Sequence, residues 1–255
     1  MDLHLKGKVI VVSGGAKGIG KAICAQLLEE KAVPVLLDKD EVAGKDFVKQ
    51  FPLSHFIAVD LYDSFACKKC IEKIEKKLGH IDGLVNNAGI NDGIGLEKGT
   101  PQKFLQSLTN NAGHYYYLAH FCLPHLKESK GSIVNVGSKV AMTGQGNTSG
   151  YAAAKGAILG LTREWAVELL PYSVRVNAVL PAEVWTSLYE SWIKSFPNPR
   201  EKKQQIENNI PLGKRMTTSE EIANTIVFLL SDRASHITGQ WVNVDGGYVH
   251  LDRAL

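Results

Sequence analysis

The stretch that decides the fold is VIVVSGGAKGIG, Val9 to Gly20 of this 255-residue chain. It begins with apolar, mostly β-branched residues typical of a buried strand, and glycine dominates its second half. A helical pattern follows, from about Gly18 to Lys31. A strand that passes through a glycine-rich turn into a helix predicts a dinucleotide site, because glycine allows close backbone approach to a pyrophosphate and the helix N-terminus supplies N–H donors. The glycines at 14, 18 and 20 have the spacing G-x-x-x-G-x-G, and no Gly-Lys-Ser/Thr follows, so this is not a Walker A loop.

Short β-branched runs alternate with helical stretches along the rest of the chain. The alternation predicts a parallel sheet covered on both faces, a single doubly wound α/β domain over residues 1–255. Six further strands are expected at Val33–Asp38, His55–Asp60, Asp82–Asn87, Ser132–Ser138, Val174–Pro181 and Gln240–Gly247. The later helices are expected to end at Lys77, to span Pro101–Lys127 and Gly150–Leu170, and to start at a capping box on Thr218 or Ser219.

One region, Ala182 to Arg215, breaks this alternation. It is rich in aromatic and charged residues, and Pro197 and Pro199 interrupt any long helix in it. Long irregular insertions in compact domains are often functional. The region is therefore predicted to be a substrate lid, with a cap on the core as the alternative use of its aromatic side chains.

Composition excludes several classes of function. Apolar residues make up 44% and charged residues 22%, and the net charge of +3 is too small for a nucleic-acid surface. The N-terminus lacks a signal-peptide core and no apolar run approaches ~18 residues, so a cytoplasmic protein with no membrane partner is expected. Cys67 and Cys70 form a C-x-x-C without a second pair, and the histidines show no ligand spacing, so no metal site is expected.

The strongest chemical signal is Tyr151 followed by Lys155 in an Ala-rich helical segment. Residues four apart share one face of a helix. An ammonium about 4 Å from a phenol, at an effective dielectric near 20, favours the phenolate by roughly 4 kcal/mol and could lower the pKa by up to ~3 units. Ser138 ends a predicted strand upstream of this pair. Of the eight tyrosines only Tyr151 has a lysine at this spacing, although Y-x-x-x-K alone arises often by chance.

Acidic residues end the second and third predicted strands. Asp38 is placed to accept hydrogen bonds from ribose hydroxyls and to repel a 2′-phosphate, which favours NAD. Lys17 and Lys39 could accommodate that phosphate, so NADP stays open. Asp60 is expected to lie against the adenine, or alternatively to cap the next helix.

The motifs together resemble the short-chain dehydrogenase/reductase family over essentially the full length. The glycine turn, Asn86-Asn87-Ala88-Gly89, Asn110 with Gly113, Ser138 with Tyr151 and Lys155, and Pro181 with Thr186 occur in the family's order. The resemblance implies a Rossmann-like fold with a seven-stranded sheet. It also implies a homotetramer assembled through the helices Pro101–Lys127 and Gly150–Leu170.

The resemblance also implies roles for individual residues. Tyr151 would be the acid/base, Ser138 would hydrogen-bond the reacting oxygen, and Lys155 would hold the nicotinamide ribose. Asn110 would position a water that completes a proton relay, although its neighbour Asn111 remains an alternative. The implied cofactor-binding residues are Gly14, Lys17, Gly18, Ile19, Gly20, Asp38, Lys39, Asp60, Leu61, Asn87, Ala88, Gly89, Tyr151, Lys155, Pro181, Val184 and Thr186. The family usually has Pro-Gly after the sixth strand, whereas this chain has Pro181-Ala182, so a small difference in nicotinamide placement is expected.

The residues expected to line the substrate side are polar or aromatic. They are Asn91, Asp92, Glu97, Gln145, Asn147, Glu183, Trp185 and Trp192. Such a set suits a sugar or polyol, because a polar site rejects analogues that leave its groups unpaired.

Within the family, the stretches NNAGINDGIGLE and LDKDE and the ending DGGYVHLDRAL are similar to L-fucose dehydrogenases. That similarity implies oxidation of an anomeric hydroxyl to a lactone. Alternatives are a hydroxysteroid or 3-oxoacyl thioester dehydrogenase, or a non-catalytic NAD(H)-binding module, against which the complete catalytic set argues. The tail His250–Leu255 is expected to reach a neighbouring subunit's site.

Overall fold

The computed structural model describes residues 2–251, and a seven-stranded parallel sheet lies at its centre in the order β3-β2-β1-β4-β5-β6-β7. The chain order reverses between β1 and β4, which leaves a crevice at the carboxyl ends of these strands. The prediction of a doubly wound α/β fold with seven strands is confirmed. The strands are β1 (Val9–Ser13), β2 (Val33–Asp38), β3 (His55–Ala58), β4 (Gly83–Asn86), β5 (Ser132–Val136), β6 (Arg175–Pro181) and β7 (Trp241–Val244).

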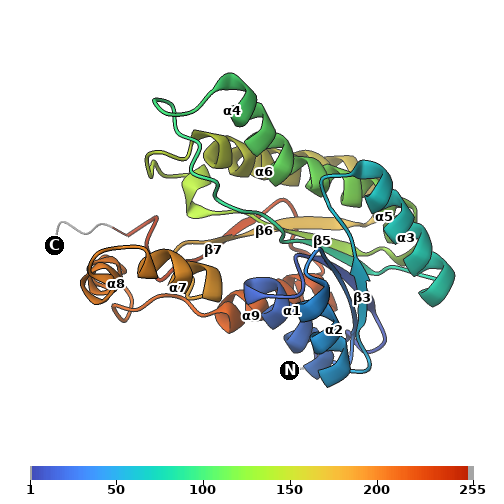
Figure 1. Cartoon of the computed structure of the whole chain (residues 1–255). Helices are drawn as coiled ribbons and strands as arrows, with labels where there is room; N and C mark the ends of the chain where they lie inside the picture. Colours follow the sequence, from blue (N-terminus) through green and yellow to red (C-terminus); the bar gives the residue numbers. More distant parts are fainter. Residues whose placement is uncertain (1, 252–255) are drawn as a thin grey trace.

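Helices cover both faces of the sheet, with α1, α2 and α9 on one face and α3 to α6 on the other (Figure 1). Because both faces are covered, the central strands are apolar almost throughout, and two separate cores form. The α-helices are α1 (Gly18–Glu29), α2 (Glu41–Gln50), α3 (Ser64–Leu78), α4 (Pro101–Leu108), α5 (His114–Ser129), α6 (Ser149–Glu168), α7 (Ser187–Lys194), α8 (Pro199–Asn208) and α9 (Ser219–Leu230). The capping box of α9 forms as predicted, between Thr218 and Glu221.

The predicted long helix over Pro101–Lys127 is interrupted. A π-helical turn, Thr109–Gly113, separates α4 from α5. Such turns insert an extra residue into an α-helix and are frequent at functional sites. The turn brings both Asn110 and Asn111 to the edge of the crevice. It also determines which of the two side chains faces the interior.

Helix α2 has no counterpart among the elements predicted by name. The carboxylate of Asp40 accepts a hydrogen bond from the Ala43 N–H and begins the helix. Gly44 looks like a helix breaker, but a Cβ built on it would lie 2.2 Å from the Phe56 ring. The glycine is needed because α2 packs closely on β3. The predicted third strand also ends earlier, at Ala58 rather than Asp60.

The region Ala182–Arg215 folds into two short helices beside the end of the sheet that carries β7 (Figure 1). Helix α7 ends before Pro197, and α8 begins at Pro199 with Asn198 as its N-cap. The prolines therefore divide the region as expected.

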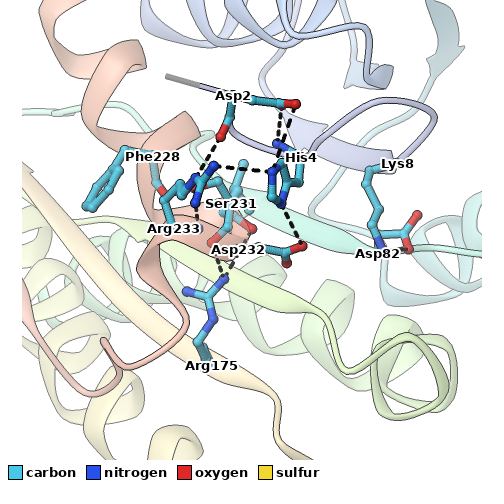
Figure 2. Close-up of polar contacts among 10 residues, drawn as sticks. Asp2, His4, Lys8, Asp82, Arg175, Phe228, Ser231, Asp232 and Arg233 are labelled. Atoms are coloured by element: carbon cyan, nitrogen blue, oxygen red, sulfur yellow. Dashed lines mark hydrogen bonds and ion pairs between the residues drawn. The ribbon is translucent and has the colours of Figure 1, made fainter.

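Polar contacts also form at the end of the sheet where the strands begin, opposite the crevice (Figure 2). The Arg175 guanidinium donates hydrogen bonds to the carbonyl oxygens of Leu229, Leu230 and Ser231 at 2.6, 3.1 and 3.1 Å, where α9 ends. Nearby, the Arg233 Nε donates to the Asp2 carbonyl oxygen at 2.7 Å. A cation at a helix C-terminus binds carbonyl oxygens that lack helical partners. The contacts at this end of the sheet are therefore structural, and the functional site is expected at the other end, where the strands finish.

Candidate active site

One cavity of about 550 Å³ opens at the carboxyl ends of the strands. It gathers Ser138, Tyr151 and Lys155 with sixteen of the seventeen predicted cofactor residues, because segments distant in sequence end at the same sheet edge. Gly20 is the exception, since it lies within α1 beneath the turn. Residues that the sequence did not single out also line the cavity, among them Asp40, His114, Val136, Leu188 and Tyr189.

The glycine turn forms one wall of the cavity and depends on its glycines. Gly14 and Gly18 have φ values of +63° and +52°, in the left-handed region that favours glycine. A Cβ built on Gly20 would lie 2.0 Å from the Gly14 carbonyl oxygen. The Asn87 amide braces the turn by donating to the carbonyl oxygens of Ser13 and Gly14 at 3.0 and 3.2 Å.

The N-terminus of α1 fits a pyrophosphate. The side chain of its N-cap residue, Lys17, makes no capping hydrogen bond. Uncapped N–H groups beside a glycine turn can bind phosphate oxygens. The shape of the turn and the uncapped helix end both fit a dinucleotide.

Carboxylates surround the far end of the same cavity. Asp38 accepts hydrogen bonds from the N–H groups of Ala16 and Asp40, each at 3.1 Å. The Asp40 carboxylate forms an ion pair with Lys17, and this contact raises the pKa of the lysine. Lys17 is therefore already paired, while Lys39 lines the cavity.

Asp60 and Leu61 also line the cavity, after β3. The Asp60 carboxylate accepts a hydrogen bond from the Tyr62 N–H at 3.0 Å. Helix α3 is capped by Asp63, whose carboxylate accepts from Phe65 and Ala66. The alternative role of Asp60 as the helix cap is therefore wrong.

Ser138, Tyr151 and Lys155 meet on the floor of the cavity. The Lys155 ammonium lies 5.6 Å from the centre of the Tyr151 ring. Burial raises the pKa of Tyr151 to about 12, although a hydrogen bond with Ser138 lowers it, and burial lowers the pKa of Lys155 to about 7. The phenol pKa of Tyr151 is therefore raised rather than lowered as expected, because burial is the largest influence on it. Tyr151 is half-buried and lines the cavity.

On the side away from the cavity, the Lys155 ammonium is held by groups that the sequence did not indicate. Its Nζ donates hydrogen bonds to the Tyr115 hydroxyl at 2.9 Å and to the Val136 carbonyl oxygen at 2.8 Å. His114 lines the cavity beside it, and burial together with the nearby Lys155 charge lowers the pKa of His114 to about 3. No local sequence pattern marks Tyr115, because its contact with Lys155 joins two helices that are distant in the sequence.

The structure favours Asn111 over Asn110 as the asparagine beside the lysine. Asn111 is fully buried, its Oδ1 accepts from the Ile90 N–H at 2.8 Å, and its Nδ2 donates to the Ser107 carbonyl oxygen at 3.0 Å. A Cβ built on Gly89 would lie 3.3 Å from Asn111 Oδ1 and 3.4 Å from Lys155 Nζ, so these two side chains flank the same glycine.

Asn110 lines the cavity, but its side chain accepts a hydrogen bond from the Gln106 amide at 2.6 Å on the exposed side. Assigning Asn110 from its spacing to Gly113 is therefore wrong for the side chain, because the π-turn shifts the helix register by one residue.

The predicted substrate residues are not brought together. Asn91 accepts a hydrogen bond from the Thr148 hydroxyl at 2.5 Å, and Asp92 accepts one from the Ser107 hydroxyl at 2.9 Å, so these side chains tie the loop after β4 to α6 and α4. The other predicted residues that do not line the cavity are Glu97, Gln145, Asn147, Glu183, Trp185 and Trp192. Gln145 and Asn147 are exposed, and Trp192 packs edge-on against Tyr189 and Phe196.

Glu183 is instead part of a small cluster beside the cavity. Its carboxylate pairs with the buried Lys139 ammonium and accepts a hydrogen bond from the Tyr189 hydroxyl at 2.6 Å. The Lys139 ammonium also lies 4.2 Å from the centre of the Tyr248 ring. The cluster connects the loop after Ser138, helix α7 and the C-terminal turn.

The nicotinamide end carries Pro181, Ala182, Val184 and Thr186. Ala182 does not have a left-handed backbone, so alanine at the usual glycine position causes no strain there. The Thr186 hydroxyl oxygen accepts a hydrogen bond from the Tyr189 N–H at 3.1 Å and begins α7. Its own hydrogen is still available to a ligand.

Metal-ligand clusters and membrane-spanning helices are absent from residues 2–251. No group of three or more His, Cys, Asp or Glu side chains is placed to hold a metal ion. Nor does any helix have the length and apolar character needed to cross a bilayer. Of the predicted tail, His250 contacts Asn243 through Nε2 and Nδ2 at 2.7 Å, and residues 252–255 lie outside the described part of the chain.

A dinucleotide-type turn joined to a serine, a tyrosine and a lysine in one cavity defines an oxidoreductase that uses a nicotinamide cofactor. Comparison with known proteins supports this class of oxidoreductase. A family model described as enoyl-(acyl carrier protein) reductase matches residues 14–249. The chain belongs to the short-chain dehydrogenase/reductase family.

Individual relatives match over nearly the whole chain. L-fucose dehydrogenase of Bos taurus is 34% identical over 97% of this chain and 91% of its own length. The structure of Cj0485 dehydrogenase is 48% identical, with a TM-score of 0.96 over 100% of this chain and 99% of the other. Ligand-free aldohexose dehydrogenase of Thermoplasma acidophilum is 30% identical, with a TM-score of 0.91 over 100% and 99%.

Proposed function

We propose that this protein is an NAD-dependent dehydrogenase that oxidises a hydroxyl group of a sugar, with L-fucose as the first candidate. The observation that carries the proposal is the cavity that holds Ser138, Tyr151 and Lys155 next to the glycine turn. A binding module without turnover has no need for this set in one place.

Each catalytic side chain has a defined task in the proposed reaction. When bound, NAD accepts a hydride from the carbon that carries the reacting hydroxyl. The Tyr151 oxygen takes the hydroxyl proton as the C–O bond becomes a double bond, and at an anomeric carbon the product is a lactone. Ser138 hydrogen-bonds the same oxygen, and the Lys155 ammonium favours the phenolate and holds the ribose. Asn111, beside Lys155, takes the place expected for Asn110.

The charges around Asp38 support NAD over NADP. A 2′-phosphate at this end of the cavity would meet the carboxylates of Asp38 and Asp40, while the ammonium of Lys17 is already bound by Asp40. Only Lys39 would be left to compensate. At an effective dielectric near 20, the repulsion between a phosphate and a carboxylate in contact costs several kcal/mol.

We expect Asp38→Asn to raise the ratio of kcat/KM for NADP to that for NAD by roughly ten- to a hundredfold, because it removes a charge and keeps the side-chain shape. Asp40→Asn should raise NADP use as well, because asparagine retains the helix cap and releases Lys17. Titration of both reduced cofactors by fluorescence measures the same change in binding.

The matched control is Glu41→Gln. Glu41 is the next residue, its carboxylate pairs with the exposed Lys45 at 2.5 Å, and it does not line the cavity. Equal NADP/NAD ratios for all three variants and the wild type would refute the charge argument.

Two observations support a polar substrate. The Lys139–Glu183 pair and the Tyr189 hydroxyl stand beside the cavity, and Tyr189 lines it with Ser187 and Leu188 of α7. L-fucose dehydrogenase and aldohexose dehydrogenase are among the proteins that this chain resembles. Helix α7 would then act as the predicted lid over the substrate.

A screen of substrates tests the proposal directly. We expect NAD reduction, followed at 340 nm, with L-fucose and related aldoses, and little with polyols or hydroxysteroids. A 3-oxoacyl thioester is assayed in the reverse direction with NADH. Turnover confined to steroids or thioesters would overturn the sugar assignment, and none with any compound would favour the binding module.

We also propose that the protein forms the homotetramer expected from the family. Exposed apolar side chains on α4 and on or just after α6 support this, including Leu105, Val167 and Leu170. Such side chains on adjacent helices are typical of interfaces between subunits.

A further inference from the structure

We propose that Tyr115 is a positioning residue that fixes the Lys155 ammonium and keeps it charged; this inference rests on the proposed function. Tyr115 is completely buried on α5, and its hydroxyl accepts a hydrogen bond from Lys155 Nζ at 2.9 Å. The hydroxyl donates in turn to the Val136 carbonyl oxygen at 2.8 Å. The three polar groups therefore form a closed triangle behind the cavity.

The count of hydrogen bonds explains what the triangle does. An ammonium has three N–H donors, and the triangle uses two, one to Tyr115 and one to Val136 at 2.8 Å. One N–H is left to bind on the cavity side. Lys155 is thereby fixed in direction before any ligand arrives, which lowers the entropy lost on binding.

No carboxylate takes this role. Within residues 2–251 Lys155 forms no ion pair with an acidic side chain. The titratable groups facing it are Tyr151 on its own helix and Tyr115 and His114 on α5. Burial raises the pKa of Tyr115 well above its usual value, so its hydroxyl stays neutral and accepts from the ammonium. Burial makes the charged lysine costly, and an oriented hydroxyl and a carbonyl offset part of that cost.

Tyr115→Phe removes the hydroxyl and keeps the ring. The lysine then loses one acceptor for its charged form, so its pKa falls, and the phenol pKa of Tyr151 rises because less positive charge stands beside it. For sugar oxidation, which requires the phenolate, we expect the rising limb of the kcat/KM–pH profile to move up by about one unit. We expect kcat/KM at pH 7 to fall roughly ten- to hundredfold, and NADH to bind several-fold more weakly by fluorescence titration.

The chain supplies a matched control, since three tyrosines stand in a row at 115–117. Tyr116→Phe makes the same chemical change one residue later, on a side chain that is 53% exposed and stacks on His120. It should leave the pH profile and NADH binding unchanged. The inference would be overturned if Tyr115→Phe had the same kcat/KM–pH profile and the same NADH affinity as Tyr116→Phe.

Failure of the inference and failure of the proposed function give different results. Absence of sugar turnover in the wild type refutes the function, yet the NADH titrations of the two variants still test the position of Lys155. If Tyr115→Phe does not fold, judged by thermal unfolding, Tyr115→Met fills similar space without a hydroxyl and is judged by the same criteria.

Discussion

Tyr151→Phe is expected to lower kcat for sugar oxidation by about a thousandfold, because proton transfer by a positioned side chain contributes between two and four orders of magnitude. The substitution removes only the oxygen that takes the substrate proton. The ring remains on the cavity floor beside Lys155. NADH binding, measured by fluorescence titration, should therefore stay within a few-fold of the wild type.

The same variant separates a catalyst from a binding module. Its thermal unfolding should match the wild type, since the hydroxyl faces the cavity rather than the core. Tyr172→Phe serves as the control for loss of a tyrosine hydroxyl elsewhere, because the Tyr172 ring keeps its contact with Lys127 and does not line the cavity. Retained turnover in Tyr151→Phe would remove the tyrosine from the reaction.

Gly20→Ala should abolish cofactor binding, raising the NADH dissociation constant at least about a hundredfold. The added Cβ would lie 2.0 Å from the Gly14 carbonyl oxygen and 2.8 Å from Asn87 Nδ2. The turn would have to move away from α1, which separates the N–H groups expected to bind the pyrophosphate. Overpacking of this kind typically costs about 1–3 kcal/mol, so the melting temperature should fall as well.

Gly144→Ala is the control for this change. Among residues 2–251, apart from its two chain neighbours, no atom lies within 4 Å of a Cβ built on Gly144, which is exposed and does not have a left-handed backbone. Its NADH affinity and melting temperature should equal those of the wild type. An alanine at position 20 that binds NADH normally would show that the turn does not hold the cofactor.

Local patterns were sufficient to predict most of the architecture. The β-branched runs, the capping box at Thr218 and the glycine turn each depend on neighbours in the sequence. Sixteen of the seventeen cofactor residues that the family resemblance implied line the cavity, where the carboxyl ends of the parallel strands meet. The glycine at position 44 is explained only by the tertiary structure, since a Cβ there would lie 2.2 Å from the Phe56 ring.

The sequence by itself determined the fold class, the glycine turn and the pairing of Tyr151 with Lys155, because each is specified by residue type at short spacing. Only the tertiary structure decided that Asn111 rather than Asn110 faces Lys155, since a single π-turn changes which side of a helix points inward. The structure also showed that Tyr115 holds the lysine, and that Asn91 and Asp92 bond to other segments of the chain rather than lining the cavity. Polar side chains find partners through contacts between distant segments, and spacing along the chain carries no information about those contacts.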